Sequence, residues 1–204
     1  MKNKKACILD YGSGNVGSLF NLLNNLDCNV KVSNDPEDIK GSTHILLPGV
    51  GAFGESMKKI NKNIPLNVLK NEVNENKKPF LGICVGMQVL ADKGYEFGEH
   101  DGLGWISGNV VKLKAKILPH IGWNNVEILK ESQLFSDIEN LRDFYFVNSY
   151  AFKVEDKNFL IAKTEYEEVF CSAVEKNNIF GVQFHPEKSQ NSGKKVIQNF
   201  LNIA

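Results

Sequence analysis

Short apolar runs alternate with stretches of helical periodicity through the first half of the chain, and this alternation constrains the fold more than any other feature. The apolar runs predict strands at residues 5–9, 29–33, 44–47 and 80–83. Between them, residues 14–26 and the segments around 56–60 and 65–73 carry apolar side chains at helical spacing. Alternating strands and helices are typical of a parallel sheet covered by helices. We therefore expect an α/β fold.

The second half of the chain has a different sequence pattern. Beyond residue 108, apolar runs follow one another at short intervals with turn signals such as Lys176-Asn-Asn178 between them, which favours antiparallel strands. These runs cover residues 109–113, 123–129, 144–152, 159–166, 169–175 and 179–184. A helix is expected to close the chain, beginning near Gly193. The sequence thus predicts one domain over residues 1–204, with an open, mixed, mainly parallel sheet.

Composition excludes several classes of protein. The 24 basic and 24 acidic residues cancel, so net charge favours neither nucleic acid nor an anionic membrane as partner. The apolar run at residues 6–9 is too short for a signal-peptide core, and no run approaches a membrane span. The four cysteines form no C-x-x-C pair, which argues against a zinc site or a disulfide framework. We expect a cytoplasmic protein with no metal and no cofactor.

The glycines of Gly12-Ser-Gly-Asn-Val-Gly17 match the pattern of a dinucleotide-binding turn. They follow a predicted strand and open a predicted helix, and Asp35 follows the next strand. Glycines also crowd any tight strand-to-helix turn, and the second half offers no further dinucleotide half-site. We favour the structural interpretation and keep a dinucleotide-binding enzyme as an alternative.

Cys84 occupies a setting that suits a nucleophile. It ends a predicted strand in PFLGICVGMQVL (residues 79–90), with Gly82 and Gly86 two positions to either side. Small residues at those positions are typical of a nucleophile elbow, where a sharp strand-to-helix turn exposes the reactive side chain. A helix starting near Val85 would direct its positive end at the sulfur and favour the thiolate, and the Val85 N–H is a natural oxyanion donor.

A cysteine nucleophile needs a base, and His185 is the histidine best placed to serve. It directly follows a predicted strand in IFGVQFHPEKS, and Pro186 favours extended backbone at His185. Residues i and i+2 of extended chain point the same way, so Glu187 is expected to accept an imidazole N–H. The other ring nitrogen then faces Cys84.

The remaining cysteines and histidines lack these signals. Cys7, Cys28 and Cys171 have no glycine flanks and are expected to be small buried apolar residues. His44 begins a strand, and His100 lies in a polar loop. For His120, in LPHIGW, a loop hydrogen bond and a contact with substrate or partner both remain open.

A glycine-rich loop, LPGVGAF (residues 47–53), follows the strand predicted at 44–47. Loops at the carboxyl ends of strands line the ligand crevice of an open α/β sheet. Gly49 and Gly51 let the backbone approach a substrate, and N–H groups here offer the second donor that an acyl-transfer site requires.

Six motifs, in order along the chain, resemble those of the triad glutamine amidotransferases, and closely those of the glutaminase subunits of imidazole glycerol phosphate synthases. They are DYGSGNVGS, LPGVGAF, GICVGMQ, PHIGWN, FVNSY and FHPEKS. The resemblance covers essentially the whole chain. It implies a flavodoxin-like fold, glutamine as substrate, a Cys84 thioester, His185 as proton relay and Glu187 as its orienting group. It further implies a heterodimer with a (β/α)8-barrel cyclase, which uses the ammonia to make imidazole glycerol phosphate and aminoimidazole carboxamide ribotide in histidine biosynthesis.

The resemblance also assigns roles to other positions. It implies oxyanion and substrate contacts at Gly49, Val50, Gly51, Val85, Gln88, Glu96, Ser149 and Tyr150. Glu96 suits the ammonium of glutamine and the Gln88 amide suits its carboxylate. Trp123 and Lys188 match positions near the face that meets the cyclase. Because Val50 lies between two glycines, its peptide could turn away from the oxyanion, and we expect low glutaminase activity without the partner.

Two positions depart from the family pattern. Val85 replaces the usual leucine, which is a mild change because the expected oxyanion contact is made by the backbone N–H and not by the side chain. Asn148 replaces a common histidine before the Ser149-Tyr150 pair and cannot take up a proton near neutral pH. Two alternatives stay open: a paralogue that supplies ammonia for sugar amidination in surface-polysaccharide synthesis, and a catalytically inactive binding subunit.

Overall fold

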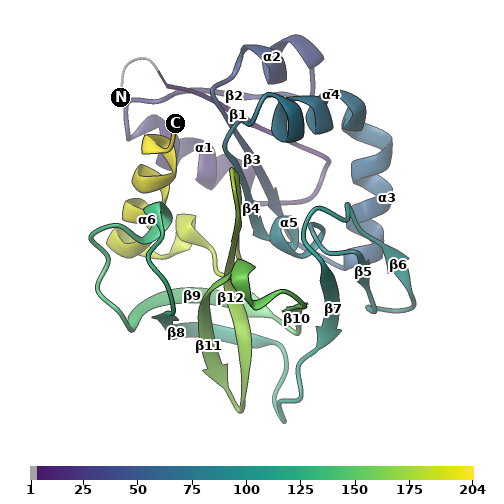
Figure 1. Cartoon of the computed structure of the whole chain (residues 1–204), viewed down its shortest axis with the longest axis vertical. Coiled ribbons are helices and arrows are strands. Elements are labelled where there is room, and N and C mark those ends of the chain that lie inside the picture. Colours follow the sequence, from purple (N-terminus) through teal and green to yellow (C-terminus); the bar gives the residue numbers. More distant parts are fainter. Residues whose placement is uncertain (1–3) are drawn as a thin grey trace.

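A computed structural model describes residues 4–204, which form a mixed nine-stranded sheet, a four-stranded sheet and the helices packed against them (Figure 1). The strand order of the larger sheet is β2-β1-β3-β4-β13-β12-β11-β8-β9. Its first five strands run parallel, and the pairings from β13 to β9 are antiparallel. The predicted α/β fold with a mixed sheet is confirmed.

The parallel half contains the four strands predicted from the alternating pattern and a fifth strand from the second half of the chain. They are β1 (Lys5–Ile8), β2 (Asn29–Val32), β3 (His44–Gly49), β4 (Phe80–Cys84) and β13 (Ile179–Val182). All six residues of β3 and all five of β4 are buried, as expected for central strands covered on both faces. One prediction is wrong here: the run at 179–184 pairs in parallel with β4 on one side, and only its other side, against β12, is antiparallel.

Helices cover this half on both sides. They are α1 (Val16–Asn24), α2 (Pro36–Gly41), α3 (Phe53–Asn63), α4 (Leu66–Lys70), α5 (Val85–Gln88) and α6 (Gln190–Asn202). A π-helical turn, Asn71–Glu75, continues α4. In Figure 1, α1 and α6 lie to one side of β3 and β4, and α3 and α4 lie to the other. No helix within residues 4–204 is long and apolar enough to cross a membrane.

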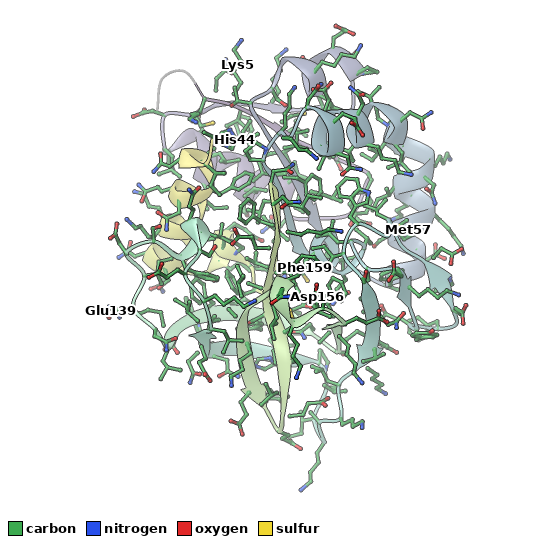
Figure 2. The ribbon with its side chains drawn as sticks, in the orientation of Figure 1. Lys5, His44, Met57, Glu139, Asp156 and Phe159 are labelled. Atoms are coloured by element: carbon green, nitrogen blue, oxygen red, sulfur yellow. The ribbon has the colours of Figure 1, made fainter. Side chains whose placement is uncertain are left out.

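The closing helix begins earlier than the sequence predicts. It starts at Gln190, and Gly193 lies inside its first turn. A Cβ on Gly193 would come within 1.9 Å of the Pro186 carbonyl oxygen, so this glycine permits close packing instead of marking a helix start. The carboxyl end of α6 reaches the labelled His44 (Figure 2), whose Nε2 lies 3.0 Å from the carbonyl oxygen of Ile203.

The antiparallel half is built from β12 (Glu168–Lys176), β11 (Leu160–Tyr166), β8 (His120–Ile128) and β9 (Arg142–Asn148). The smaller sheet contains β10 (Tyr150–Val154), β7 (Gly108–Lys112), β5 (Lys93–Gly94) and β6 (His100–Asp101). Single 3₁₀ turns occupy Gln133–Phe135, Lys157–Phe159 and Pro186–Lys188. The run at 144–152, predicted as one strand, divides at Ser149 into β9 in one sheet and β10 in the other. This division brings both sheets together beside the candidate site.

Candidate active site

Strand register brings three loops to one edge of the larger sheet. Gly49, at the end of β3, is the register partner of Cys84, at the end of β4. On the other side of β4, Ile83 pairs with Val182, so the chain leaving β13 toward His185 emerges beside Cys84. Parallel strands end at the same edge, which is where ligands bind in open α/β sheets. The three motifs predicted to form a site therefore lie together.

Cys84 sits on a strained strand-to-helix turn. Its backbone has φ 55° and ψ −111°, outside the regions that non-glycine residues ordinarily occupy. Val85 begins α5, a single helical turn. A Cβ on Gly86 would lie 1.8 Å from the Leu47 carbonyl oxygen, and a Cβ on Gly82 would lie 2.3 Å from the Gly86 carbonyl oxygen. The flanking glycines thus make room for the backbone of the elbow.

The glycine-rich loop at residues 49–51 lies directly against this turn. A Cβ on Gly49 would meet the Tyr11 hydroxyl at 2.1 Å and the Gly86 nitrogen at 3.1 Å, so no larger residue fits there. Val50 is exposed, and Gly51 adopts φ +113°. This loop and Val85 both line the space next to Cys84.

His185 and Glu187 form a buried pair. The His185 Nδ1 lies 2.9 Å from Glu187 Oε1, and both side chains are about 3% exposed. The predicted contact is present and His185 has the expected extended backbone, with φ −100° and ψ 98°, but the chain does not stay extended to Glu187, because Pro186–Lys188 form a 3₁₀ turn. Burial opposes a charged ring, but interactions with Cys84 and Glu187 outweigh it and raise the pKa of His185 well above its ordinary value. The arrangement favours an imidazolium beside the sulfur.

A cavity of about 350 Å³ opens over the sulfur. Among its lining residues are the predicted positions Val50, Gly51, Cys84, Val85, Gln88, Glu96, Ser149, Tyr150, His185 and Lys188, together with Asn148. Gly49 and Glu187 lie behind the cavity wall, the first as register partner of Cys84 and the second as partner of His185. The sequence positions are thus brought around one cavity.

Two residues that line the cavity, Gln88 and Glu96, already form hydrogen bonds with other protein groups. The Gln88 amide nitrogen donates to the Tyr150 carbonyl oxygen at 2.9 Å and to Gln183 Oε1 at 3.0 Å. An amide nitrogen has two hydrogens, so only the oxygen of Gln88 is left for a ligand. The expectation that Gln88 donates to a substrate carboxylate therefore conflicts with these contacts. Glu96 accepts from the Phe53 N–H at 2.9 Å through one oxygen, which fixes its carboxylate at the cavity.

Trp123 and Lys188 flank one half-buried aromatic side chain, Tyr145. Trp123, which is 48% exposed, meets Tyr145 edge-on at 6.0 Å between ring centroids. The Lys188 ammonium lies 5.6 Å from the centre of the same Tyr145 ring. Trp123 does not line the cavity, whereas Lys188 does. The two residues predicted to meet a partner therefore lie against the same Tyr145 side chain.

Sequence reasoning missed two buried residues at the site. Gln183 donates its Nε2 to Cys84 Sγ at 3.6 Å. A sequence signal for Gln183 existed: it lies two positions before His185, so in extended chain the two side chains are expected to point the same way. Tyr11 packs its hydroxyl against Gly49, and burial raises the pKa of this phenol strongly. Tyr11 lies in the DYGSGNVGS motif, but the motif did not indicate its role, because its contact joins the loop after β1 to the end of β3.

The other histidines have structural contacts, and His100, which was expected in a polar loop, lies in strand β6 and pairs with Gly94 of β5. Burial lowers the pKa of His44 to about 4 and keeps its ring neutral. His120 is buried between Phe146 and Tyr166, with ring centroids 5.2 and 4.0 Å away, and Asn124 Nδ2 lies 3.4 Å from its Nε2. His120 begins β8 instead of lying in a loop, and its hydrogen bond is to a side chain of that same strand. Among residues 4–204, no three His, Cys, Asp or Glu side chains gather so as to hold a metal ion.

The glycine turn at residues 12–17 is also accounted for by backbone contacts. Gly12 and Gly14 have φ values of +85° and +142°, which side chains rarely adopt. Lys59 donates to Ser13 Oγ at 2.7 Å and ties the turn to α3. Asp35 caps α2 by accepting from the Glu37 N–H at 2.7 Å, so its carboxylate serves a helix start. The preferred structural interpretation agrees with these contacts.

Comparison with known proteins identifies the class that this fold and site define. The family model described as glutamine amidotransferase class-I matches residues 7–204, and the chain belongs to that family. In fold it is similar to the structure of PurLQS from Thermotoga maritima, with a TM-score of 0.73, 18% identity, and coverage of 99% of each chain.

Within this class, the chain is similar to curated relatives of one particular kind. The imidazole glycerol phosphate synthase subunit HisH of Pelagibacter ubique is 47% identical over 208 residues, covering 96% of this chain and 98% of its own. A Campylobacter jejuni protein named imidazole glycerol phosphate synthase subunit HisH 1 is 42% identical, with the same coverage of both chains. The resemblance drawn from the six motifs is confirmed.

Proposed function

We propose that the chain, as one domain over residues 1–204, is the glutaminase subunit of an imidazole glycerol phosphate synthase. The single observation that carries the chemistry is the group formed by Cys84 on its strained turn and the buried His185–Glu187 pair. The similarity to HisH subunits supports the assignment to histidine biosynthesis. A biosynthetic role of this kind agrees with the expected cytoplasmic location.

The reaction follows from the groups at hand. The Cys84 thiolate attacks the side-chain amide carbon of glutamine, and the amide oxygen takes up the negative charge. N–H groups of Val85 and of the loop at Gly49–Gly51 stabilise this oxyanion. The His185 imidazolium gives its proton to the departing nitrogen, ammonia leaves, and a thioester remains. His185 then takes a proton from water, which attacks the thioester, releases glutamate and restores the thiolate.

The remaining cavity residues are proposed to hold the amino acid end of glutamine. Glu96 supplies a carboxylate for the ammonium, and the Gln88 oxygen is a second acceptor for it. Ser149 and Tyr150 lie where two sheets meet and are proposed to contact the substrate carboxylate. The cavity volume of about 350 Å³ suits a small amino acid.

The surface with Trp123 and Lys188 is proposed to meet a (β/α)8-barrel cyclase in a heterodimer. Ammonia released at Cys84 would then pass to the cyclase without reaching solvent. Exposed Val50 at the cavity supports the expectation that partner binding adjusts the oxyanion loop and raises activity.

One observation favours a second candidate function. Asn148 is buried at the cavity, and its Oδ1 has no partner within residues 4–204. A titratable contact at this position is absent, so a paralogue serving sugar amidination with a different partner remains the alternative.

The test is glutamate release from glutamine by the protein alone and with the histidine-pathway cyclase of its own organism plus the cyclase substrate. Strong stimulation that Cys84→Ala abolishes is the expected result. No stimulation by a cyclase that is active with free ammonia would favour the sugar-amidination candidate. Turnover that survives in Cys84→Ala would refute the proposed nucleophile, and a wild-type protein inactive under all conditions would indicate a binding subunit.

A further inference from the structure

Gln183 is a fully buried amide that contacts the reactive sulfur. It follows β13, and its Nε2 lies 3.6 Å from Cys84 Sγ. The sulfur also lies 3.9 Å from the Val147 carbonyl oxygen, to which only a protonated thiol can donate. The sulfur therefore has a neighbour that favours the thiolate, Gln183, and a neighbour that favours the thiol, Val147.

The orientation of the Gln183 amide is fixed by a chain of hydrogen bonds that starts at a backbone carbonyl. The Tyr150 carbonyl oxygen can only accept, so Gln88 must present its nitrogen to it, at 2.9 Å. The second hydrogen of that nitrogen goes to Gln183 Oε1 at 3.0 Å. Gln183 must then present its own nitrogen to the sulfur.

The Tyr150 carbonyl oxygen, where this series of hydrogen bonds starts, also accepts from a second donor. Asn148 Nδ2 donates to the same Tyr150 carbonyl oxygen at 3.2 Å. Asn148 ends β9 and Tyr150 begins β10, so the carbonyl sits at the crossing between the two sheets. Gln88, Asn148 and Gln183 are all at least nine-tenths buried, so no water competes freely for these bonds.

We propose that Gln183 is a further catalytic residue, which donates a hydrogen bond to the Cys84 thiolate and holds the sulfur toward the amide carbon of glutamine. Gln88 acts through Gln183 as a positioning residue, and Asn148 supports the Tyr150 carbonyl oxygen at the other end. The role of Gln183 in turnover rests on the proposed glutaminase function; its effect on the thiolate does not.

The experiment measures the rate at which iodoacetamide alkylates Cys84 as a function of pH, with the modified peptide identified by mass spectrometry. Gln183→Met keeps the approximate length of the side chain and removes the N–H donor. Gln183→Glu keeps an oxygen for Gln88 and replaces the donor with a carboxylate. Both variants are expected to move the alkylation midpoint to higher pH, lowering the reaction rate at neutral pH by about tenfold for methionine and by more for glutamate.

A matched control separates this effect from a general loss of buried hydrogen bonds. Asn199, in α6, is a buried amide that donates to the carbonyl oxygens of Leu134 and Ser136 at 3.1 and 2.7 Å. Asn199→Leu is expected to lower thermal stability and leave the midpoint unchanged. Glutaminase assays of the Gln183 variants are expected to show a lower kcat with KM nearly unchanged.

The outcomes distinguish the two proposals. Folded Gln183→Met or Gln183→Glu protein with the wild-type midpoint would overturn the role of Gln183, whatever the glutaminase activity. If the variants shift the alkylation midpoint but the wild-type protein hydrolyses no glutamine, the contact with the thiolate is supported and the proposed function is refuted. If Gln183→Met does not fold, the nearly isosteric Gln183→Glu decides.

Discussion

Replacing Glu187 with glutamine removes one negative charge from the buried pair while keeping the shape of the side chain. Glu187 accepts from His185 Nδ1 at 2.9 Å, with both side chains about 3% exposed. A hydrogen bond to a charged group is worth about 1.5–3 kcal/mol. If that stabilisation is lost from the step in which His185 carries a proton, the rate falls roughly 10- to 150-fold. Glu187→Gln is expected to lower kcat within this range and to change KM little.

The pH dependence gives the same variant a second readout. Glu187 helps to raise the pKa of His185. Removing its charge lowers that pKa, so the imidazolium is lost at lower pH and the alkaline limb of the kcat/KM profile should move to lower pH.

The assay is steady-state glutamate release across pH, compared with Glu139→Gln. Glu139 is labelled at the surface in Figure 2, pairs with Arg142 and is 76% exposed, so its variant should stay within about twofold of wild type. A Glu187→Gln enzyme with more than about half of the wild-type kcat and an unmoved alkaline limb would refute the reasoning.

Two further predictions concern the fold around the site. Gly86→Ala places a Cβ 1.8 Å from the Leu47 carbonyl oxygen and should destabilise the protein by at least about 2 kcal/mol in urea unfolding. Gly17→Ala, with open space around its Cβ, should not destabilise it. Equal stabilities of the two variants would contradict the close packing of the elbow. His44 has its pKa lowered to about 4 by burial, so the folded state binds fewer protons than the unfolded state between that pH and about 6.5, and stability falls as pH falls through this window. Going from about pH 7.5 to about pH 5 should therefore cost the wild type about 2 kcal/mol more than His44→Gln, and parallel stability profiles would show that His44 does not titrate in this way.

The nucleophile elbow and the base could be predicted because their signals are local. Gly82, Cys84 and Gly86 lie within five residues, and His185 and Glu187 are two apart, so short-range sterics and strand direction were enough to suggest their roles. Even there, the sequence could not show that Pro186–Lys188 form a 3₁₀ turn, because one turn of chain is decided by what it packs against.

Contacts between distant segments escaped prediction. The run at 144–152 reads as one strand, and only competition between two sheets for its backbone divides it at Ser149. That division presents the Tyr150 carbonyl oxygen to one N–H of Gln88, and Gln183 Oε1 takes the other, so neither N–H is left for the substrate. Gln183 lies two positions before His185, but a buried glutamine just after a strand is notable only when its partners are known.

The sequence by itself determined the class of this protein: the alternating pattern specifies strands and helices through local periodicity, and the motifs specify a cysteine, a base and an orienting carboxylate. Tertiary structure decided how these parts meet. Parallel pairing of β13 with β4 places His185 beside Cys84, a pairing between segments nearly 100 residues apart that depends on the order of strands in the sheet. Register and burial then set the charge of His185 and the direction of each amide, because those depend on neighbours that only the folded chain supplies.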